Sequence, residues 1–419
     1  MIESEGTALP APELLASADR LRSRNPPFAL ELRDPAGAAV RVSAGEPELT
    51  VTARTPAGLA VLANLGELAV VEAYLDGDID IDGDLVRAME LRPLLRGDGV
   101  AMRVWSVLEP ALRGRIRTNP QVVATHYDSG NIQLLATDDE YALYTPGVYE
   151  CDEDTLEEAA RRKLERVFAA LRLAPGHALL DIGCGWGGQM RFCAERGIDV
   201  TGISLSRHQL EHARNELASR GLHGDARYAD FFAYEPGRRF DAISMMGVLE
   251  ELSDYRTVLR RVSEWLKPDG MLYLDFAAVA RRFQVSSFVA KYVWPGAFRM
   301  VHFPQFLSAV DGSPFELVAV EEDRRNYYLW THKALERWVA RHDEAVAMSD
   351  ERTYRVIRML GASTCFIMGP RSTRATAYRV LLRRRQDGAR LGELVATPGA
   401  PARRSAADYI PPIIRRALG

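Results

Sequence analysis

The sequence has few cysteines, no long uncharged apolar run and little net charge. Its four cysteines are spread over 419 residues and show neither paired metal-ligand spacing nor a dense disulfide framework. No segment approaches the ~18 uncharged apolar residues of a membrane-spanning helix, and the N-terminus lacks the basic start and apolar stretch of a signal peptide. The formal net charge of -4 gives no overall attraction to nucleic acid. These absences predict a protein of the reducing cytoplasm, without a metal site or a nucleic-acid partner, that is soluble or at most peripheral to a membrane.

Two parts with different patterns follow one another along the chain. Residues 28–54 alternate apolar and polar side chains around Pro, Gly and Asp turns, which predicts a small antiparallel sheet, and helical spacing follows it. We therefore expect an N-terminal α+β accessory domain over residues 1–110 and a connector over 111–154 that covers the functional site. Residues 386–419 are rich in Pro and Arg and are expected to form a loosely ordered tail.

Residues 155–385 alternate strand and helix patterns. Thr155 and Glu158 stand at capping-box spacing at the start of the first helix. The strand candidates that follow are "HALLDIG", "DVTGISLS", "ARYADF", "FDAISMMGV" and "GMLYLDFAAV". This alternation predicts an α/β domain built on a doubly wound parallel sheet.

The glycine-rich stretch "LLDIGCGWGGQMRF" is the strongest motif of the chain. Gly183, Gly185 and Gly188 satisfy the spacing G-x-G-x-x-G, which by itself is compatible with a dinucleotide site or with a plain strand-to-helix turn. A nicotinamide site usually has a carboxylate about twenty residues later, at the end of the second strand. That strand ends in "TGISLSRHQL", which has none, whereas Asp181 lies inside the glycine motif. This arrangement is usual in class I methyltransferases that bind S-adenosylmethionine (SAM).

Several colinear segments resemble the cyclopropane fatty acid synthase family, SAM-dependent enzymes that methylate unsaturated acyl chains. The resemblance covers roughly residues 28–385. Its segments are "LGELAVVEAYLDGDIDIDGDL", "HYDSGN", "YTPGVYE", "LDIGCGWGG", "GISLSRHQL" and "KYVWPGAF". The resemblance implies a class I SAM-methyltransferase (Rossmann-like) fold with a small N-terminal α+β domain, and SAM as cofactor.

The resemblance also implies a set of cofactor contacts. Tyr144 and Thr145 would contact SAM, Asp181, Gly183 and Gly185 would belong to the motif around its methionine portion, Ser204 and Gln209 would hold the ribose, and Asp230 and Phe231 would border the adenine. Simpler alternatives stay open for the aromatic residues, because either could be a packed core side chain.

The sequence departs from the family pattern at the catalytic base. Family members hold a bicarbonate ion with Cys, Glu, His and Tyr side chains. Here the Cys position is Pro146, the His position is Asp275 and the Glu position is Glu250. The family's Tyr corresponds to Tyr328, with Tyr327 as an equally available register.

Extra carboxylates would repel bicarbonate, which argues against its binding. We expect Glu250 or Asp275 to act directly as the base, with pKa values raised by mutual repulsion and burial. Alternatively, Asp275 is a strand-end hydrogen-bond acceptor. The neighbouring Glu251, where the family usually has His, reads as an exposed acid in the first turn of a helix.

The predicted function is SAM-dependent C-methylation of the double bond of an unsaturated fatty acyl (phospho)lipid. The product could be a cyclopropane, a methylene or a methyl branch. Residues 283–298 fit an acyl-chain wall or a core helix, and the Arg-rich residues 371–385 fit lipid headgroups, an acidic carrier or the solvated face of an edge strand. Alternatives are a same-fold methyltransferase with a non-lipid or carrier-bound acceptor, a non-catalytic SAM- or lipid-binding homologue and, more distantly, a nicotinamide oxidoreductase.

Overall fold

The computed structural model describes most of the chain, and the account below concerns these residues. They are 9–97, 134–137, 140–252, 254–279, 286–293, 300–372 and 375–386. The segment "HYDSGN", the second half of "KYVWPGAF" and the tail after residue 386 therefore lie outside the described residues. One compact unit ends at Arg384, close to the predicted end of the methyltransferase domain.

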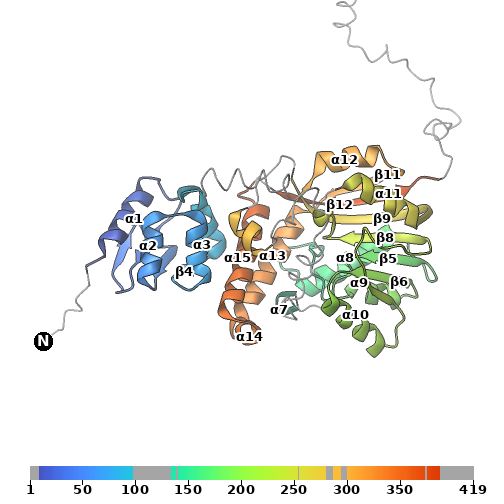
Figure 1. The fold of residues 1–419 in the computed structure, drawn as a ribbon, viewed down its shortest axis with the longest axis horizontal. Coiled ribbons are helices and arrows are strands. Elements are labelled where there is room, and N and C mark those ends of the chain that lie inside the picture. The colour runs from blue at the N-terminus through green and yellow to red at the C-terminus, as the bar shows by residue number, and fades with distance from the viewer. Residues whose placement is uncertain are drawn as a thin grey trace, which may run out of the picture. The chain divides into compact units, whose positions relative to one another are not determined.

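The N-terminal module consists of a four-stranded sheet and short helices (Figure 1). Its elements are α1 (Pro12–Arg22), β1 (Leu30–Arg33), β2 (Ala39–Arg41), β3 (Leu49–Ala53), α2 (Pro56–Asn64), α3 (Glu67–Leu75), β4 (Ile79–Gly83), α4 (Leu85–Ala88) and the 3-10 helix η1 (Met89–Leu94). The strand order is β2-β1-β3-β4. The predicted antiparallel sheet is wrong in one pair, because β1 and β3 run parallel while the other two pairs are antiparallel.

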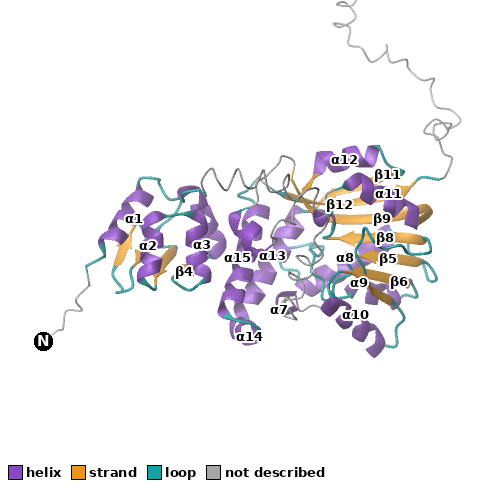
Figure 2. Cartoon of the chain, in the orientation of Figure 1, coloured by secondary structure: helices purple, strands orange, loops and turns teal. Residues whose placement is uncertain are grey.

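The second sheet carries the five strands predicted from the alternation, and the prediction of a doubly wound α/β fold is confirmed (Figure 2). They are β5 (Ala178–Ile182), β6 (Asp199–Ser204), β7 (Asp225–Tyr228), β8 (Phe240–Met246) and β9 (Leu266–Val279), with β10 (Val301–His302), β11 (Phe315–Glu322) and β12 (Thr376–Arg384) completing the sheet. The order is β11-β12-β9-β8-β5-β6-β7, with β10 paired to β9. Strands β5 to β9 pair in parallel.

Helices cover both faces of this sheet. Successive strand residues point to opposite faces, so Leu179 packs in one core with α8 (Leu156–Ala170), α9 (Gly188–Ala194) and α10 (Arg207–Ser219). Leu180 packs in the other core with α11 (Tyr255–Trp265) and α12 (Phe303–Asp311). The predicted capping box of Thr155 and Glu158 starts α8. The chain order reverses on either side of β5, and ligands of such sheets bind at this switch point, outside the carboxyl ends of the strands.

A helical insertion separates the last two strands of the sheet. It consists of α13 (Arg324–Ala340), α14 (His342–Met348) and α15 (Glu351–Met368). Met359 and Ala362 of α15 belong to the same apolar core as the N-terminal module, together with Phe288 and Val293 from the segment around the π-helix η4 (Val289–Val293). The core of the module is therefore completed by residues far along the chain.

The Arg-rich strand β12 is not at the edge of the sheet, which corrects the predicted solvated edge strand. It lies between β9 and β11 and is antiparallel to both. Its arginines bind within the fold: Arg379 pairs with Asp323, Arg383 pairs with Glu316, and Arg384 donates to the carbonyl of Leu266. These side chains are thus engaged in the sheet rather than presented to a lipid headgroup. Among the described residues, no helix has the length and apolarity needed to cross a bilayer.

Candidate functional site

The glycine loop turns the chain from β5 into α9. Gly183, Gly185 and Gly187 all have positive φ, a conformation that L side chains rarely adopt. A side chain at Gly183 would also collide with Val248, which follows β8. Around Gly185 a Cβ atom would meet nothing within 4 Å, so the loop leaves open space there. The loop therefore borders a cavity at the switch point of the sheet.

All nine predicted cofactor residues line this one cavity, which we call the donor cavity. It has a volume of about 140 Å³. The nine are Tyr144, Thr145, Asp181, Gly183, Gly185, Ser204, Gln209, Asp230 and Phe231. They meet because they follow the ends of neighbouring parallel strands, or belong to the segment that covers those ends. Phe231 also packs in the core against Trp265, so the cavity and core interpretations of this residue both hold. The binding role of the set stays a prediction.

The polar groups of the donor cavity suit a ligand with positive charge. Oδ1 of Asp181 accepts a hydrogen bond from Ser244 at 3.1 Å, whereas its Oδ2 has no partner among the described residues. Burial raises the pKa of Asp181 to about 7. Asp230 and Glu251 also line the cavity, and its described lining contains no Lys or Arg. A pyrophosphate would face carboxylates here, whereas an ammonium or sulfonium group would be stabilised by them.

Two further buried polar atoms point to a ligand at the same place. Within the described structure, neither Nε1 of Trp186 nor Oε1 of Gln189 has a hydrogen-bond partner, and both residues line the donor cavity. At the end of β6, Ser204 donates to Oε1 of Gln209 at 3.4 Å, and both side chains face the same space. Buried polar groups are normally paired, so a polar ligand with donors and acceptors fits this cavity. The spacing of the glycine motif does not single out Trp186 or Gln189, although both stand within "LLDIGCGWGGQMRF".

A second, larger cavity adjoins the first. It has a volume of about 300 Å³ and a predominantly apolar lining, and we call it the acceptor cavity. Tyr144, Thr145 and Gly247 line both cavities, so the two spaces meet there. Burial raises the pKa of Tyr144 to about 12, which keeps this phenol neutral. Phe288 and Val289 of the predicted acyl wall line the acceptor cavity, and Phe288 is at the same time a core residue.

Glu250 is the carboxylate that faces the acceptor cavity with a free oxygen. It lies in the single 3-10 turn η3 (Leu249–Glu251) after β8 and is buried. Its Oε1 accepts the backbone N–H of Ala277 at 2.7 Å, while Oε2 has no partner in the described part of the chain. Burial, with a smaller contribution from the nearby Asp275 carboxylate, raises the pKa of Glu250 to about 8. A carboxyl group with such a pKa can accept or hold a proton near neutral pH.

Asp275 is held differently, by a buried lysine that sequence analysis missed. Nζ of Lys163, on α8, lies 2.7 Å from Oδ2 of Asp275, and both side chains are almost fully buried. The same ammonium donates to Oγ1 of Thr145 at 2.6 Å. The only signal in the sequence is a lysine on the apolar face of a helix, which does not reveal its partner. Since its charge is neutralised, Asp275 fits a role in positioning Thr145 better than a role as a free base.

The structure selects between the two tyrosine registers and changes the interpretation of Glu251. Tyr327 lines the acceptor cavity, and burial followed by the charges of Glu250 and Asp275 raises the pKa of its phenol. Tyr328, the predicted residue, packs instead beside Met368 and His332 and does not line the cavity. The geometry therefore favours Tyr327 over Tyr328, and the role of either tyrosine stays a prediction. Glu251 stands in the first turn of η3 as predicted, but it is half-buried and lines the donor cavity, so the predicted exposure is wrong.

The segment that carries Tyr144 and Thr145 is fixed from several sides. Arg379 of β12 donates to the carbonyl of Gly147 at 2.9 Å, and this arginine is itself paired with the buried Asp323. A side chain at Gly147 would collide with Ala159 of α8, because the two backbones touch. The covering segment is therefore packed directly on the helix that supplies Lys163.

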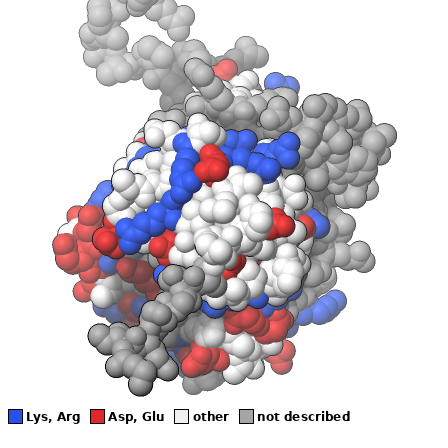
Figure 3. Space-filling model, turned by 90° about the vertical axis from the view of Figure 1, so that its left-hand side faces the viewer, with Lys and Arg blue, Asp and Glu red and all other residues white. Residues whose placement is uncertain are grey.

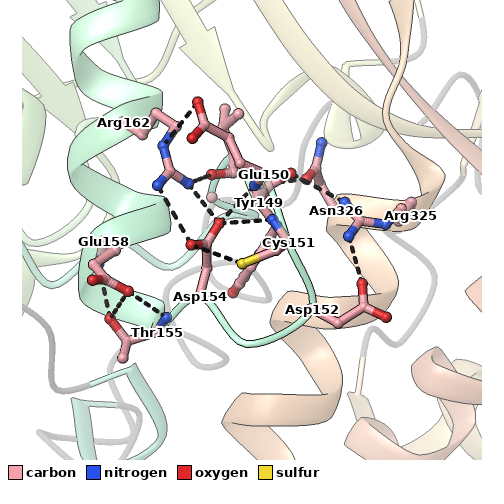
Figure 4. A network of polar contacts seen from close by, with 12 residues as sticks. Tyr149, Glu150, Cys151, Asp152, Asp154, Thr155, Glu158, Arg162, Arg325 and Asn326 are labelled. Atoms are coloured by element: carbon pink, nitrogen blue, oxygen red, sulfur yellow. Dashed lines mark hydrogen bonds and ion pairs between the residues drawn. The ribbon is translucent and has the colours of Figure 1, made fainter.

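A polar network fixes the end of the covering segment (Figure 4). Tyr149 donates its N–H to Oδ1 of Asn326 at 2.8 Å and accepts from Arg325 at 3.0 Å, both on α13. Asp154 accepts the backbone N–H groups of Glu150 and Cys151 and pairs with Arg162 of α8 at 2.8 Å. The network ties the end of the covering segment to α8 and α13.

The strand order, the glycine loop and the cavity at the switch point together define a class I SAM-dependent methyltransferase fold. Residues 115–368 match the profile of the family described as "Mycolic acid cyclopropane synthetase". The chain belongs to this family, as the resemblance predicted.

Three relatives give the extent of the similarity. The chain is 26% identical over 339 residues to the sphingolipid C9-methyltransferase of Komagataella phaffii, a match that covers 75% of this chain and 69% of the relative. It is 26% identical over 319 residues to a "Probable fatty acid methyltransferase" of Pseudomonas putida, over 70% and 77% of the two chains. The structure of the cyclopropane synthase MmaA2 from Mycobacterium tuberculosis matches with a TM-score of 0.58 at 22% identity, over 64% of this chain and 100% of that one. The chain spans slightly less than two thirds of the length of three further fungal sphingolipid C9-methyltransferases.

Proposed function

We propose that this protein is a SAM-dependent methyltransferase that adds a methyl or methylene group to the double bond of an unsaturated acyl lipid. The observation that carries this proposal is the meeting of two cavities of opposite chemistry at Tyr144, Thr145 and Gly247. One cavity has carboxylates and unpaired polar atoms, and the other is mostly apolar. Methyl transfer needs a donor and an acceptor that are oriented together and shielded from water.

The donor cavity would hold SAM through polar side chains at and after the carboxyl ends of β5 and β6. Oδ2 of Asp181, which has no partner among the described residues, would bind the ammonium of the methionine portion. Ser204 and Gln209, which share a hydrogen bond of 3.4 Å, would turn to the ribose hydroxyls. When bound, SAM supplies an electrophilic methyl group on a sulfonium centre. The absence of basic side chains from the described lining favours this cation over a dinucleotide.

The acceptor cavity would hold the acyl chain through apolar contact. The relatives are named as methyltransferases of sphingolipids and of fatty acids, and both names support a lipid acceptor for this chain. An alkene carbon placed at Tyr144 and Thr145 would lie at the entrance to the donor cavity. The covering segment would hold the two reactants in line and keep water from the site.

Glu250 would be the base and the stabilising anion. Methylation of the alkene produces a cation, and Oε2 of Glu250 is the buried carboxylate oxygen that can face it without a competing partner. Removal of a proton from the added methyl group by Glu250 would allow ring closure or leave a methylene branch. Pro146 offers no side-chain donor where the family has Cys, and Asp275 already has Lys163 as its cation. We therefore propose that the carboxylate of Glu250 replaces bicarbonate.

Contact with a lipid surface is also part of the proposal. The face of the molecule in Figure 3 carries a band of Lys and Arg side chains beside an uncharged area, while Asp and Glu side chains gather at the left and lower margins. Basic side chains beside an uncharged surface suit peripheral contact with anionic headgroups. Such contact would bring the acyl acceptor to the protein without a membrane-spanning segment.

Lipid profiling would test this function. The protein and its Glu250→Gln variant would be expressed in a host without a cyclopropane synthase that is fed methyl-labelled methionine. We expect labelled acyl chains that have gained one CH2 unit in the wild type only. Ring protons in the NMR spectrum would identify a cyclopropane, and vinylidene protons would identify a methylene product. Unlabelled lipids in cells that contain folded wild-type protein would overturn the proposed acceptor.

A further inference from the structure

The acceptor cavity extends from the buried carboxylates of Glu250 and Asp275 into the interior of the N-terminal module. At one end it is lined by Glu250, which follows β8, and by Asp275, which lies in β9. At the other end its lining consists of core side chains of the module. These are Leu21 of α1, Leu30 and Leu32 of β1, Leu49 and Val51 of β3, and Leu62 of α2. All six are buried, so the space lies inside the module and not on its surface.

The part of the cavity within the module offers nothing to a polar headgroup. Its charged lining residues, in the described structure, are Glu67 and Arg92, and these two pair with each other at 2.6 Å. Placing a charged or strongly polar headgroup among leucine side chains would cost several kcal/mol. A hydrocarbon tail, by contrast, gains free energy with each methylene group buried there.

Polar contacts join the module to the helical insertion around this space. Arg352 pairs with Asp76 at 2.8 Å, and Arg355 pairs with Asp80 at 3.3 Å. Both arginines lie on α15, and α15 also lines the cavity through Ile357, Met359 and Leu360. The wall of the cavity therefore combines the module with the methyltransferase domain, and the module is part of the acceptor site.

We propose that the N-terminal module receives the methyl end of the acyl chain, and that it thereby sets which double bond is modified. This inference rests on the proposed function, since it assigns one end of the acceptor to each end of the cavity. With the methyl end enclosed in the module, the length of acyl chain between the methyl end and the double bond must match the length of the cavity between its module end and Glu250. Selectivity then follows the position of the double bond counted from the methyl end.

Binding of free fatty acids of increasing chain length, from lauric to oleic acid, tests the assignment by calorimetry. In the wild type we expect the affinity to rise about fourfold per added methylene group. Ala88→Phe places a phenyl ring into the module end of the cavity, so the gain should stop at the longer chains. Val70→Phe, on the cavity side of α3, is a second variant with the same expectation. Ala60→Phe adds the same bulk on the exposed face of α2, off the cavity, and should bind like the wild type.

Turnover measurements separate this inference from the proposed function. Ala88→Phe should lose methylation of long acyl chains and keep methylation of acceptors with a short segment beyond the double bond. Among acceptors of equal length, the wild type should prefer one double-bond position counted from the methyl end. Unchanged length dependence in both folded cavity variants would overturn the inference while leaving methyl transfer intact. Loss of all methyl transfer in the wild type would instead overturn the proposed function.

Discussion

Removal of the Lys163 ammonium should destabilise the protein more than removal of any exposed lysine. Lys163→Met keeps the length of the side chain but leaves the Asp275 carboxylate buried without the cation that lies 2.7 Å away. It also removes the donor to Thr145. Breaking a buried pair in this way costs about 3–5 kcal/mol, mostly because an uncompensated charge stays in the interior. The loss should appear in urea unfolding as a lower midpoint with an unchanged slope.

A matched control and a double variant make this prediction sharp. Lys267→Met breaks the pair with Asp241, whose lysine is about half exposed, and should cost no more than about 1 kcal/mol. Asp275→Asn alone should also be costly, whereas the double variant with Lys163→Met removes both charges. We expect the loss of unfolding free energy in the double variant to be smaller than the sum of the two single losses, by about 1–3 kcal/mol. Additive single effects, or a Lys163→Met cost equal to that of Lys267→Met, would refute the role of the pair.

The remaining predictions concern catalysis and binding. The pKa of Glu250 is raised to about 8, so the fraction of its carboxylate form, which is needed for proton removal, grows as the pH rises toward 8. A pH profile of kcat/KM should therefore rise up to about pH 8 and level off above it. Bound SAM is a cation that favours the carboxylate, so the rise in the pH profile of kcat should lie at lower pH. Glu250→Gln should lower turnover by about 10²–10⁴-fold with SAM affinity retained in calorimetry, and an active variant would remove this residue from the mechanism. Asp181→Asn should weaken SAM binding by about 10- to 100-fold through loss of a charged hydrogen bond, as titration would show. Tyr327→Phe should slow turnover whereas Tyr328→Phe should not, and the opposite ranking in a rate assay would restore the other register.

The sequence predicted the methyltransferase domain well because its signals are local. Alternating strand and helix patterns fix the sheet, and cofactor candidates gather at the carboxyl ends of parallel strands. Asp181 follows this rule at β5, Ser204 at β6 and Asp230 after β7. Their meeting in one cavity could therefore be predicted without knowing how the helices pack. The glycine motif likewise places the turn correctly, since positive φ is required there.

Features that depend on packing between distant segments were out of reach. Adjacent residues on a helix point about 100° apart, so only the position of α13 decides between Tyr327 and Tyr328. The partner of Lys163 lies on a strand more than a hundred residues later, and periodicity cannot identify it. The interior place of β12 and the parallel pairing of β1 with β3 depend in the same way on long-range pairing.

The most direct test of the central claim uses purified protein, SAM with a carbon-13 methyl group and phospholipid vesicles with oleoyl chains. The account predicts that the labelled carbon becomes bonded to a carbon of the former double bond, as carbon NMR of the extracted lipid would show. Glu250→Gln should give no such signal while still binding SAM. A labelled carbon on a headgroup nitrogen or oxygen would contradict the account. So would labelled SAM that stays unreacted with folded wild-type protein that binds SAM.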